Sequence, residues 1–214
     1  MRRIAVIDYG MGNLRSVSKA LETVSGSSAE ILVSANPDIL LSASHILFPG
    51  VGAIRDCIDE LKKRGLDEVI KEVARHKPFL GICLGMQAML SHSEENDGID
   101  ALGIIPGEVK AFDNPVSPQG EKLKVPHMGW NQVHQTCDHP LWKNIEQDSR
   151  FYFVHGYYVN PADLAVVAAT THYGDDFASA IYRDNVFVTQ FHPEKSQRAG
   201  LQLLENFVNW DGQS

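Results

Sequence analysis

Two patterns of hydrophobic residues divide the chain near its middle. In the first half, four short apolar runs are typical of buried strands, at residues 4–7, 31–33, 45–48 and 79–82. After the first run, apolar residues recur at the spacing of one helix face: Leu14, Val17, Leu21 and Val24. Residues 53–76 predict a second helix, interrupted near Gly65. Strands that alternate with helices predict a parallel sheet covered by helices on both faces.

The second half of the chain is richer in β-forming residues. Short runs there predict strands at residues 109–112, 130–133, 151–154, 166–170, 178–182 and 186–191. A last helix begins near Ser196 and turns three apolar residues inward, Leu201, Leu204 and Phe207. No repeat or linker interrupts the pattern. We therefore predict one α/β domain over residues 1–214, with a central, mostly parallel sheet flanked by helices and a β-rich second half.

Composition and charge indicate which partners, compartment and bound groups to expect. A formal net charge of -8 makes nucleic acid and an anionic membrane poor partners, and no apolar run approaches membrane-spanning length. Three cysteines fit a reducing compartment. The N-terminus becomes acidic at Asp8, before a signal-peptide core could form. We expect a cytoplasmic protein. We expect no metal site, because no histidine shows zinc-type spacing with a cysteine, and we expect no cofactor.

Candidate chemistry lies at the turns that end three of the predicted strands. Glycine-containing turns follow Ile7 and Phe48, and a third surrounds Cys83. Ligands of parallel sheets bind at the carboxyl ends of the strands, so these turns predict one site. Residues 79–87 read FLGICLGMQ, a strand, a tight turn and a helix that match the nucleophile elbow of Gly-x-Ser-x-Gly hydrolases. We predict that Cys83 is a nucleophile at a helix N-terminus, where aligned amides favour its thiolate.

A cysteine nucleophile needs a base, and the base needs a group that orients it. His192 and Glu194 supply both candidates. Residues two apart in an extended segment point to the same face, and Pro193 stiffens the backbone between them. The pattern predicts that His192 faces Cys83 while Glu194 holds the imidazole tautomer.

The tetrahedral intermediate of such an attack also needs an oxyanion hole. In elbow folds one donor is the amide that follows the nucleophile, which is Leu84 here. A second donor comes from another strand-end loop, and the loop at Val51 and Gly52 suits this role. Glycines on both sides of Val51 let the peptide approach the substrate closely.

The motifs together resemble the class I, triad-type glutamine amidotransferases. GICLGMQ at residues 81–87 and FHPEKS at residues 191–196 carry this resemblance. Within the family, further segments resemble the glutaminase subunits of imidazole glycerol phosphate synthases: DYGMGN at 8–13, FPGVG at 48–52, PHMGWN at 126–131 and FYFVH at 151–155. The resemblance extends nearly from end to end of the chain.

The resemblance implies an activity and a partner. Glutamine would be hydrolysed to glutamate and ammonia through a γ-glutamyl thioester on Cys83. The ammonia would pass to a (β/α)-barrel cyclase subunit, which makes imidazole glycerol phosphate and an aminoimidazole carboxamide ribotide in histidine biosynthesis. The resemblance also implies that the Gly50–Val51 peptide turns its amide toward the substrate oxygen when the partner binds its ligand.

The same resemblance assigns residues to substrate and partner. The implied glutamine-binding set is Gly50, Gly52, Gln87, Glu95, Gly156 and Tyr157. The residues implied near the subunit interface and the ammonia exit are Asn13, Trp130, Tyr152 and Lys195. The chain departs from the family at Gly156, where the family usually has Ser or Thr. Binding is unaffected by this change if only backbone contacts the substrate there, whereas the affinity for glutamine is in doubt if the hydroxyl matters.

Other functions remain open on the residues alone. A self-contained cysteine hydrolase would use the same triad, and a paralogous amidotransferase subunit of another pathway would keep nearly every motif. A noncatalytic subunit would have no need of an intact triad. Gly10-Met11-Gly12 is not a dinucleotide fingerprint, because Arg15 replaces the third glycine.

Ordinary structural roles are the alternative for several single residues. Cys57 and Cys137 are expected to be inert hydrophobic residues. His155 is either a second base or, as its apolar neighbours favour, a structural residue. Residues 126–131 are either a turn that enters a strand or an exposed contact surface for a partner.

Overall fold

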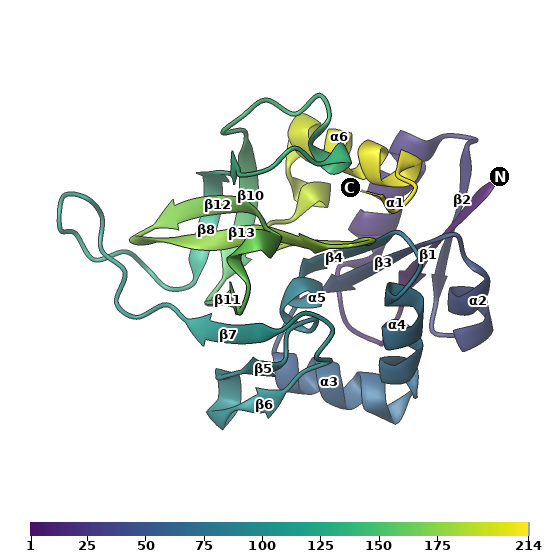
Figure 1. Cartoon of the computed structure of the whole chain (residues 1–214), viewed down its shortest axis with the longest axis horizontal. Coiled ribbons are helices and arrows are strands. Elements are labelled where there is room, and N and C mark those ends of the chain that lie inside the picture. The colour runs from purple at the N-terminus through teal and green to yellow at the C-terminus, as the bar shows by residue number, and fades with distance from the viewer. Residues whose placement is uncertain (214) are drawn as a thin grey trace.

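A large mixed sheet forms the centre of the molecule in the computed structural model, which describes residues 1–213 (Figure 1). Five neighbouring strands of this sheet are parallel: β2 (Ala29–Ser34), β1 (Arg2–Ile7), β3 (His45–Gly50), β4 (Phe79–Cys83) and β14 (Val186–Thr189). The four strands predicted in the first half are therefore confirmed, and so is their parallel arrangement. Their carboxyl ends meet at one edge of the sheet, where the three glycine-containing turns lie.

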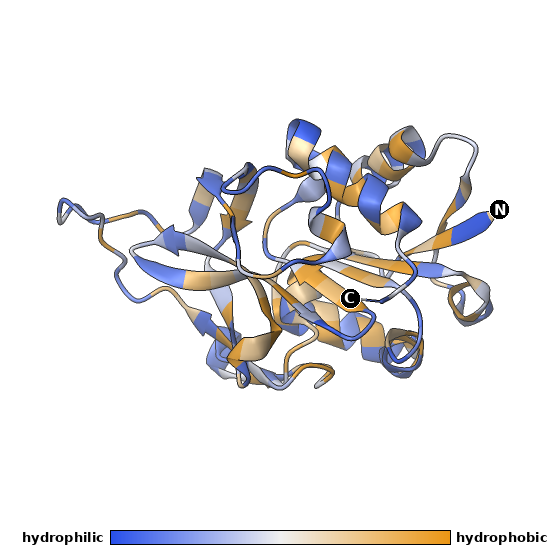
Figure 2. Cartoon of the chain, turned by 45° about the horizontal axis from the view of Figure 1, so that its top comes forward, coloured by the Kyte–Doolittle hydropathy of each residue, from blue (hydrophilic) through white to orange (hydrophobic). Residues whose placement is uncertain are grey.

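Helices cover both faces of the parallel part of the sheet. One face carries α1 (Leu14–Ser25) and α6 (Gln197–Asn209), and the other carries α2 (Pro37–Ser42), α3 (Ile54–Lys63) and α4 (Leu66–Ala74). Strand residues alternate between the two apolar layers: Ile4 packs with the α1 and α6 side, and Ala5 with the other. Figure 2 shows the apolar strands enclosed between these helices. Gly65, with a φ of 66°, separates α3 from α4, as its position in the sequence predicted.

The α6 prediction needs one correction. Leu203, Leu204 and Phe207 are fully buried, whereas Leu201 is only half-buried. Because α6 begins at Gln197, Leu203 lies at the centre of the buried stripe and Leu201 lies at its margin.

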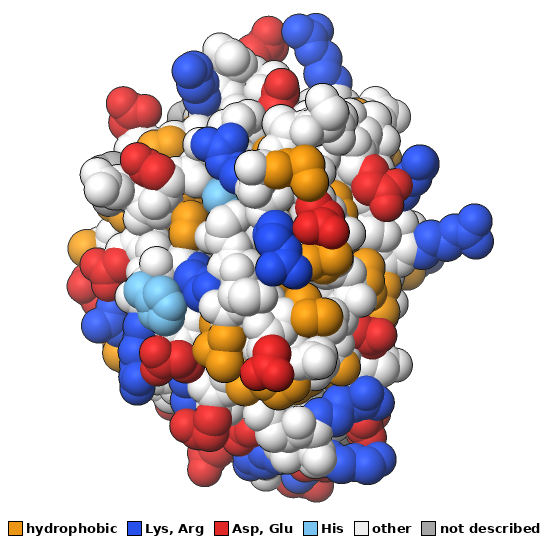
Figure 3. Space-filling view, turned by 90° about the vertical axis from the view of Figure 1, so that its right-hand side faces the viewer, with side chains coloured by type: hydrophobic (Ala, Val, Ile, Leu, Met, Phe, Trp, Pro, Cys, Tyr) orange, Lys and Arg blue, Asp and Glu red, His pale blue; other side chains and the backbone are white. Residues whose placement is uncertain are grey.

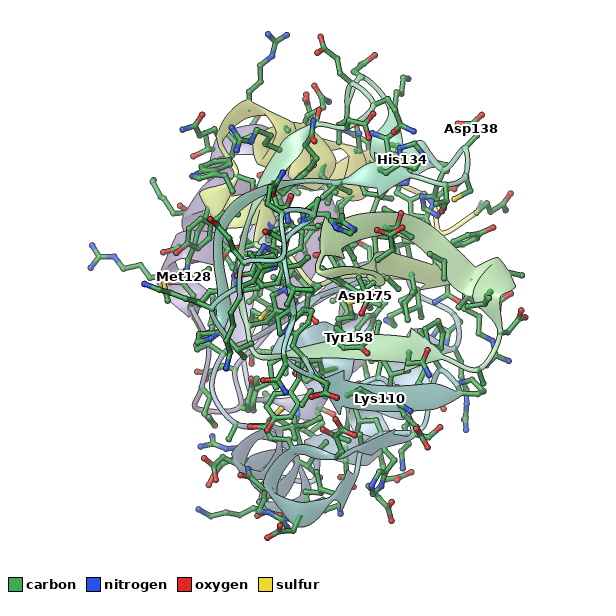
Figure 4. All side chains as sticks on the ribbon, turned by 90° about the vertical axis from the view of Figure 1, so that its left-hand side faces the viewer. Lys110, Met128, His134, Asp138, Tyr158 and Asp175 are labelled. Atoms are coloured by element: carbon green, nitrogen blue, oxygen red, sulfur yellow. The ribbon has the colours of Figure 1, made fainter. Side chains whose placement is uncertain are left out.

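Antiparallel strands extend the sheet beyond β14. The order continues through β13 (Asp175–Arg183), β11 (Tyr157–Pro161), β7 (Gly107–Ala111), β5 (His92–Ser93) and β6 (Ile99–Asp100). On its other side β13 also pairs with β12 (Val167–Tyr173), which pairs with β9 (His134–Gln135). Most pairs here are antiparallel, and β5 with β7 is parallel. In Figure 4, Lys110 and Tyr158 lie on the neighbouring strands β7 and β11.

Short 3-10 turns complete the second half of the chain. They are η1 (Glu95–Asp97), η2 (Pro140–Trp142), η3 (Leu164–Val166) and η4 (Pro193–Lys195). The predicted β-rich character is confirmed, but several bounds differ. Strand β11 and the two-residue strands β5, β6 and β9 were not predicted, and β14 ends at Thr189 rather than at residue 191. Residues 190–192 leave the sheet there, which brings the chain to the candidate site.

A separate two-stranded sheet pairs β8 (His127–Gln132) with β10 (Arg150–His155). Because side chains alternate along each strand, this ribbon has two different faces. Met128 and Trp130 are exposed on one face, whereas His127 and His155 are buried on the other. Figure 4 shows Met128 at the periphery of the molecule. The connection from β7 to β8 extends away from the rest of the chain (Figure 1).

The molecular surface mixes charges of both signs. The end of the molecule near β2 and α2 carries Lys, Arg, Asp and Glu side chains with small apolar areas between them (Figure 3). No helix within residues 1–213 combines the length and the apolar composition needed to cross a membrane.

The elbow after β4 is held by a very close approach between backbones. A Cβ atom on Gly85 would lie 2.1 Å from the carbonyl oxygen of Phe48, and one on Gly81 would lie 2.7 Å from Val188 Cγ1. Only glycine at residue 85 therefore lets the elbow pack directly against the end of β3. Since Gly50 pairs with Cys83 in register, the same packing places the loop after β3 beside the elbow.

We predict that Gly85→Ala destabilises the fold by about 1–3 kcal/mol or more, because backbone cannot yield to a methyl group as a flexible side chain can. The matched control is Gly156→Ala. A Cβ there meets no atom closer than Val125 Cγ1 at 3.7 Å, and we expect little loss of stability. Denaturant unfolding of both variants measures the difference. Equal losses would show that the close approach at Gly85 does not limit stability.

Candidate active site

Cys83 lies at the junction of β4 and α5 (Leu84–Gln87), in a backbone conformation that is unusual for a residue with a side chain. Its φ is 54° and its ψ is -108°, and it is 7 % exposed. Strained backbone of this kind is concentrated at functional sites. The predicted strand, turn and helix are present, but α5 is a single turn. The dipole of so short a helix favours a thiolate less than the sequence analysis assumed. Neighbouring side chains therefore matter more for lowering the energy of the Cys83 thiolate.

The chain that leaves β14 brings His192 to the same edge of the sheet. Thr189 is in register with Ile82, so residues 190–192 emerge beside Cys83. His192 is 1 % exposed, and its Nδ1 lies 2.9 Å from Glu194 Oε1. This contact forms although Glu194 lies in the turn η4 rather than in the extended segment that the sequence predicted. Asn13 Nδ2 donates a hydrogen bond to the same carboxylate oxygen at 3.4 Å.

The electrostatic surroundings of His192 favour its charged form. Burial by itself lowers the pKa of the ring, but Cys83 and Glu194 act in the opposite direction and raise the pKa to about 9. The Nε2 atom is buried without a hydrogen-bond partner among residues 1–213. This nitrogen is therefore available to receive a proton from a thiol, and the resulting imidazolium would be stabilised by Glu194.

Strand β10 holds the backbone of His192 in place. The His192 amide donates to the Tyr152 carbonyl at 2.9 Å, and the Ser196 hydroxyl donates to the His192 carbonyl at 2.6 Å. The Tyr152 amide completes the connection by donating to the Ser196 hydroxyl at 3.0 Å. The sequence analysis did not identify Ser196, because its role depends on contact with a strand distant in the sequence.

A cavity of about 280 Å³ opens beside the cysteine, at the lower end of the range for small-molecule sites. Eight of its lining residues belong to the predicted site: Val51, Gly52, Cys83, Leu84, Gln87, Glu95, Gly156 and Tyr157. Val154 and His155 also line it. Gly50 does not line the cavity. It packs against the elbow instead, where an added Cβ would lie 2.7 Å from Leu84 Cβ.

The predicted oxyanion residues lie around the elbow. Val51 and Gly52 follow β3, and Leu84 follows the cysteine, so backbone from two loops borders the same cavity. Gly52 has a φ of 102°, a conformation that residues with side chains rarely adopt. Backbone amides in this region are the natural donors for an oxyanion that forms next to Cys83.

Gln87 lines the cavity and is bonded to a second, fully buried glutamine, Gln190. Gln87 Nε2 donates to the Tyr157 carbonyl and to Gln190 Oε1, both at 3.0 Å. Gln190 Nε2 lies 3.7 Å from Cys83 Sγ, and the thiol in turn lies 3.9 Å from the Val154 carbonyl. The sequence analysis missed Gln190. Its position two residues before His192, on the same face of an extended segment, was an available signal.

Glu95 brings a carboxylate to the edge of the cavity. It is half-buried, and it accepts a hydrogen bond from the Ile54 amide at 3.3 Å. Burial raises the pKa of this carboxyl above its usual range, although the bond from Ile54 opposes the shift.

His155 is not arranged as a second base. Burial lowers its pKa to about 3, and its Nδ1 lies 2.8 Å from the Tyr157 carbonyl, to which it donates. This supports the structural interpretation of His155. Cys57 is buried, and burial raises its pKa to about 12, which keeps it protonated and inert. Cys137 is half-buried, and burial raises its pKa as well.

Three of the four predicted interface residues form a surface cluster. The rings of Trp130 and Tyr152 lie 6.1 Å apart, and Lys195 Nζ lies 5.7 Å from the centre of the Tyr152 ring. Trp130 is 39 % exposed, and the neighbouring Met128 is 63 % exposed. Asn13, the fourth, donates a hydrogen bond to the carboxylate of Glu194, the residue before Lys195.

Comparison with known proteins shows full-length similarity. The model of the family described as "Glutamine amidotransferase class-I" matches residues 5–210. Proteins named imidazole glycerol phosphate synthase subunit HisH are 57 % identical in Nitrosococcus oceani, over 100 % of both chains, and 54 % identical in Pseudomonas putida, over 99 % of both. The corresponding protein of Acinetobacter baylyi is 56 % identical over 99 % of this chain and 100 % of its own.

Solved structures share the fold at low sequence identity. The structure of PurLQS from Thermotoga maritima superimposes with a TM-score of 0.71 at 19 % identity, covering 97 % of this chain and 98 % of that one. A glutamine amidotransferase from the same organism gives a TM-score of 0.61 at 18 % identity, covering 92 % and 78 %. These likenesses bear out the predicted α/β fold.

We predict that Glu194→Gln lowers the pKa of His192 from about 9 toward its ordinary value, because the carboxylate that stabilises the charged ring is lost while its shape is kept. Titration of the His192 ring signals by NMR measures the shift. Asp176→Asn is the control, since it alters an exposed His172–Asp176 pair and leaves His192 untouched. An unchanged pKa in Glu194→Gln would mean that the carboxylate does not stabilise the imidazolium.

Proposed function

The chain belongs to the class I glutamine amidotransferase family, and on this premise we propose that it is the glutaminase subunit of an imidazole glycerol phosphate synthase that serves histidine biosynthesis. One observation supports the chemistry most directly. Cys83 lies on a strained elbow beside a small cavity, with His192 held at 2.9 Å by the buried carboxylate of Glu194. Full-length identity above 50 % to HisH subunits supports the assignment to this member of the family.

The first half of the reaction forms a thioester. His192 Nε2 takes the proton of the Cys83 thiol, and the sulfur attacks the side-chain carboxamide carbon of glutamine. The carbonyl oxygen becomes an oxyanion that accepts hydrogen bonds from backbone at Leu84 and at Val51 or Gly52. The carbon–nitrogen bond then breaks, and His192 gives its proton to the leaving nitrogen, which departs as ammonia.

The second half restores the enzyme. His192 removes a proton from water, and the resulting hydroxide attacks the thioester carbon. The carbon–sulfur bond breaks, glutamate leaves, and the proton on His192 returns to Cys83. Glu194 holds the ring through Nδ1 and stabilises the imidazolium that forms twice in each cycle.

Glutamine is held by residues around the rest of the cavity. The Glu95 carboxylate complements the α-ammonium group of the substrate, and the Gly156–Tyr157 segment lines the same cavity. Gln87 fixes the position of the cavity wall, since its two amide hydrogens already bind Tyr157 and Gln190. Gly156 serves through its backbone, so the absence of the hydroxyl usual in the family leaves binding intact. Gly50 contributes by packing against the elbow.

The partner in this proposal is the cyclase subunit, which forms a heterodimer with this chain in the cytoplasm and consumes the ammonia. The surface cluster of Trp130, Tyr152 and Lys195 suits a protein contact, because tryptophan and tyrosine are enriched among the residues that dominate binding energy at interfaces. Asn13 connects the N-terminal turn to Glu194 and lies near the path of the ammonia. The cyclase ligand turns the Gly50–Val51 peptide so that its amide can serve the oxyanion.

We predict that Cys83→Ala abolishes glutamine-dependent synthesis by the two-subunit enzyme but preserves synthesis driven by added ammonium. The substitution removes the nucleophile and little volume from a residue that is only 7 % exposed. Steady-state assays with each nitrogen source measure both activities. Loss of both would assign Cys83 a structural role. In the same assays, a high glutaminase rate of the unmodified chain without a partner would favour a self-contained hydrolase.

We predict that Trp130→Ala weakens cyclase binding by about 2 kcal/mol, roughly 30-fold in Kd, and changes stability little, because the ring is 39 % exposed in the free subunit. Titration calorimetry and a melting curve measure the two effects. Leu164→Ala is the control, an exposed apolar residue outside the cluster that should change neither. A large fall in melting temperature with unchanged affinity would contradict the interface assignment.

A further inference from the structure

We propose that His127 and His155 form a neutral histidine relay that positions the Tyr157 carbonyl at the wall of the glutamine cavity. The histidine relay comprises Asn131, His127, His155 and the Tyr157 carbonyl. It would tie the cavity to β8, the strand that carries Met128 and Trp130 on its outer face. The inference rests on the proposed function for the identity of the substrate, and on the hydrogen-bond geometry for everything else.

The four groups form an unbroken line of hydrogen bonds. Asn131 Nδ2 lies 3.3 Å from His127 Nε2, and His127 Nδ1 lies 2.9 Å from His155 Nε2. His155 Nδ1 lies 2.8 Å from the Tyr157 carbonyl oxygen. His127 and His155 are directly opposite each other in the β8–β10 pairing, so the strand register itself brings the two rings together.

The two ends of the line determine where every proton lies. The Tyr157 carbonyl can only accept, so His155 Nδ1 carries a proton and its Nε2 accepts. His127 Nδ1 must then donate to His155, which leaves His127 Nε2 as an acceptor. At the other end Asn131 Nδ2 also donates to the His172 carbonyl at 2.9 Å, while Asn131 Oδ1 accepts from the Gln132 amide at 2.8 Å. The amide orientation is thus set independently, and it supplies the donor that His127 Nε2 requires.

The surroundings favour neutral rings with fixed orientations. His127 is 3 % exposed and lies between the rings of Phe153 and Tyr173, with centroids 4.8 Å and 4.0 Å away. His155 is 5 % exposed, with the Phe112 ring 5.3 Å away. Burial lowers the pKa of His127 to about 4, which agrees with the neutral state required by the hydrogen bonds. Polar groups buried among aromatic rings are costly unless they are paired, and the relay pairs all four ring nitrogens.

The relay acts at the Tyr157 carbonyl, which is already part of the active-site wall. That oxygen accepts from His155 Nδ1 and from Gln87 Nε2, so both of its acceptor positions are occupied. The Tyr157–Tyr158 peptide, to which this oxygen belongs, cannot rotate without breaking both bonds. Since Gly156 and Tyr157 line the cavity, the relay positions the backbone that faces glutamine.

The relay also leads outward to the surface. Residues of β8 alternate, so that the buried His127 is followed by the exposed Met128, and the exposed Trp130 by the half-buried Asn131. Figure 4 shows Met128 at the periphery. A partner that binds Met128 and Trp130 would therefore contact the strand whose inner face holds Tyr157 in place. His127 and His155 are positioning residues and do not touch the reacting atoms.

The protonation pattern can be measured without any activity assay. In the unmodified full-length chain at neutral pH, nitrogen-15 histidine NMR should show both rings neutral and protonated at Nδ1. Exposed His134 and His172 provide reference signals in the same spectrum. A proton on Nε2 of either relay ring, or a charged ring, would overturn the relay.

The effect on glutamine is tested with His155→Leu and His155→Asn. Leucine removes the donor to Tyr157, and we expect the KM for glutamine to rise about tenfold in the complex with cyclase, with kcat and ammonium-driven synthesis nearly unchanged. The asparagine amide nitrogen occupies the place of Nδ1, and this variant should recover most of the lost affinity. His45→Leu is the matched control, a buried histidine bonded to the Trp210 carbonyl far from the cavity, which should lower stability without changing KM.

The possible outcomes separate the two proposals. Equal KM values for His155→Leu, His155→Asn and the unmodified chain would overturn the positioning role, as would equal impairment of both His155 variants. If His155→Leu does not fold, His127→Asn and His127→Leu provide the same comparison one step further along the relay. Absence of glutaminase activity in the unmodified complex would instead contradict the proposed function, while the NMR measurement would still decide the relay.

Discussion

The close approach of Gly85 to the Phe48 carbonyl is the constraint on which the active site depends. It lets the turn after β4 pack against the end of β3 with no side chain between them. The parallel register then places Gly50 opposite Cys83, and Thr189 opposite Ile82. The ends of β3, β4 and β14 therefore lie side by side. This brings Cys83, the loop after β3 and the segment that carries His192 to one edge of the sheet.

Strand β10 connects this edge to the rest of the molecule. Its backbone binds His192 through the Tyr152 carbonyl and reaches the thiol of Cys83 through the Val154 carbonyl. Its side chains alternate between the surface cluster and the buried histidine pair. The two-stranded sheet therefore carries the exposed cluster on one face and supports the site with the other. A displacement of this ribbon would change the geometry around Cys83 and His192 and the lining of the cavity together.

The sequence located most of the chemistry because the relevant signals are local. Cys83 is marked by flanking glycines, and His192 and Glu194 are marked by their spacing around proline. The family resemblance located most of the cavity lining, although the binding roles of those residues remain predictions. Gln190 and Ser196 were missed because each acts through a contact with an element far away in the chain. Strand β11 was missed because its five residues, YYVNP, include a proline and an asparagine, which disfavour strands when read alone.

By itself the sequence determined the alternating strands and helices of the first half and the position of the elbow, because hydrophobic period and glycine placement act over a few residues. It also predicted Cys83 as nucleophile and His192 as base. Only the tertiary structure decided which groups touch. The contact between His192 and Glu194 forms across a 3-10 turn, Gly50 packs against the elbow instead of lining the cavity, and His155 donates to a backbone carbonyl instead of acting as a base. These outcomes depend on register and burial, which arise only when strands distant in the sequence pair and exclude water.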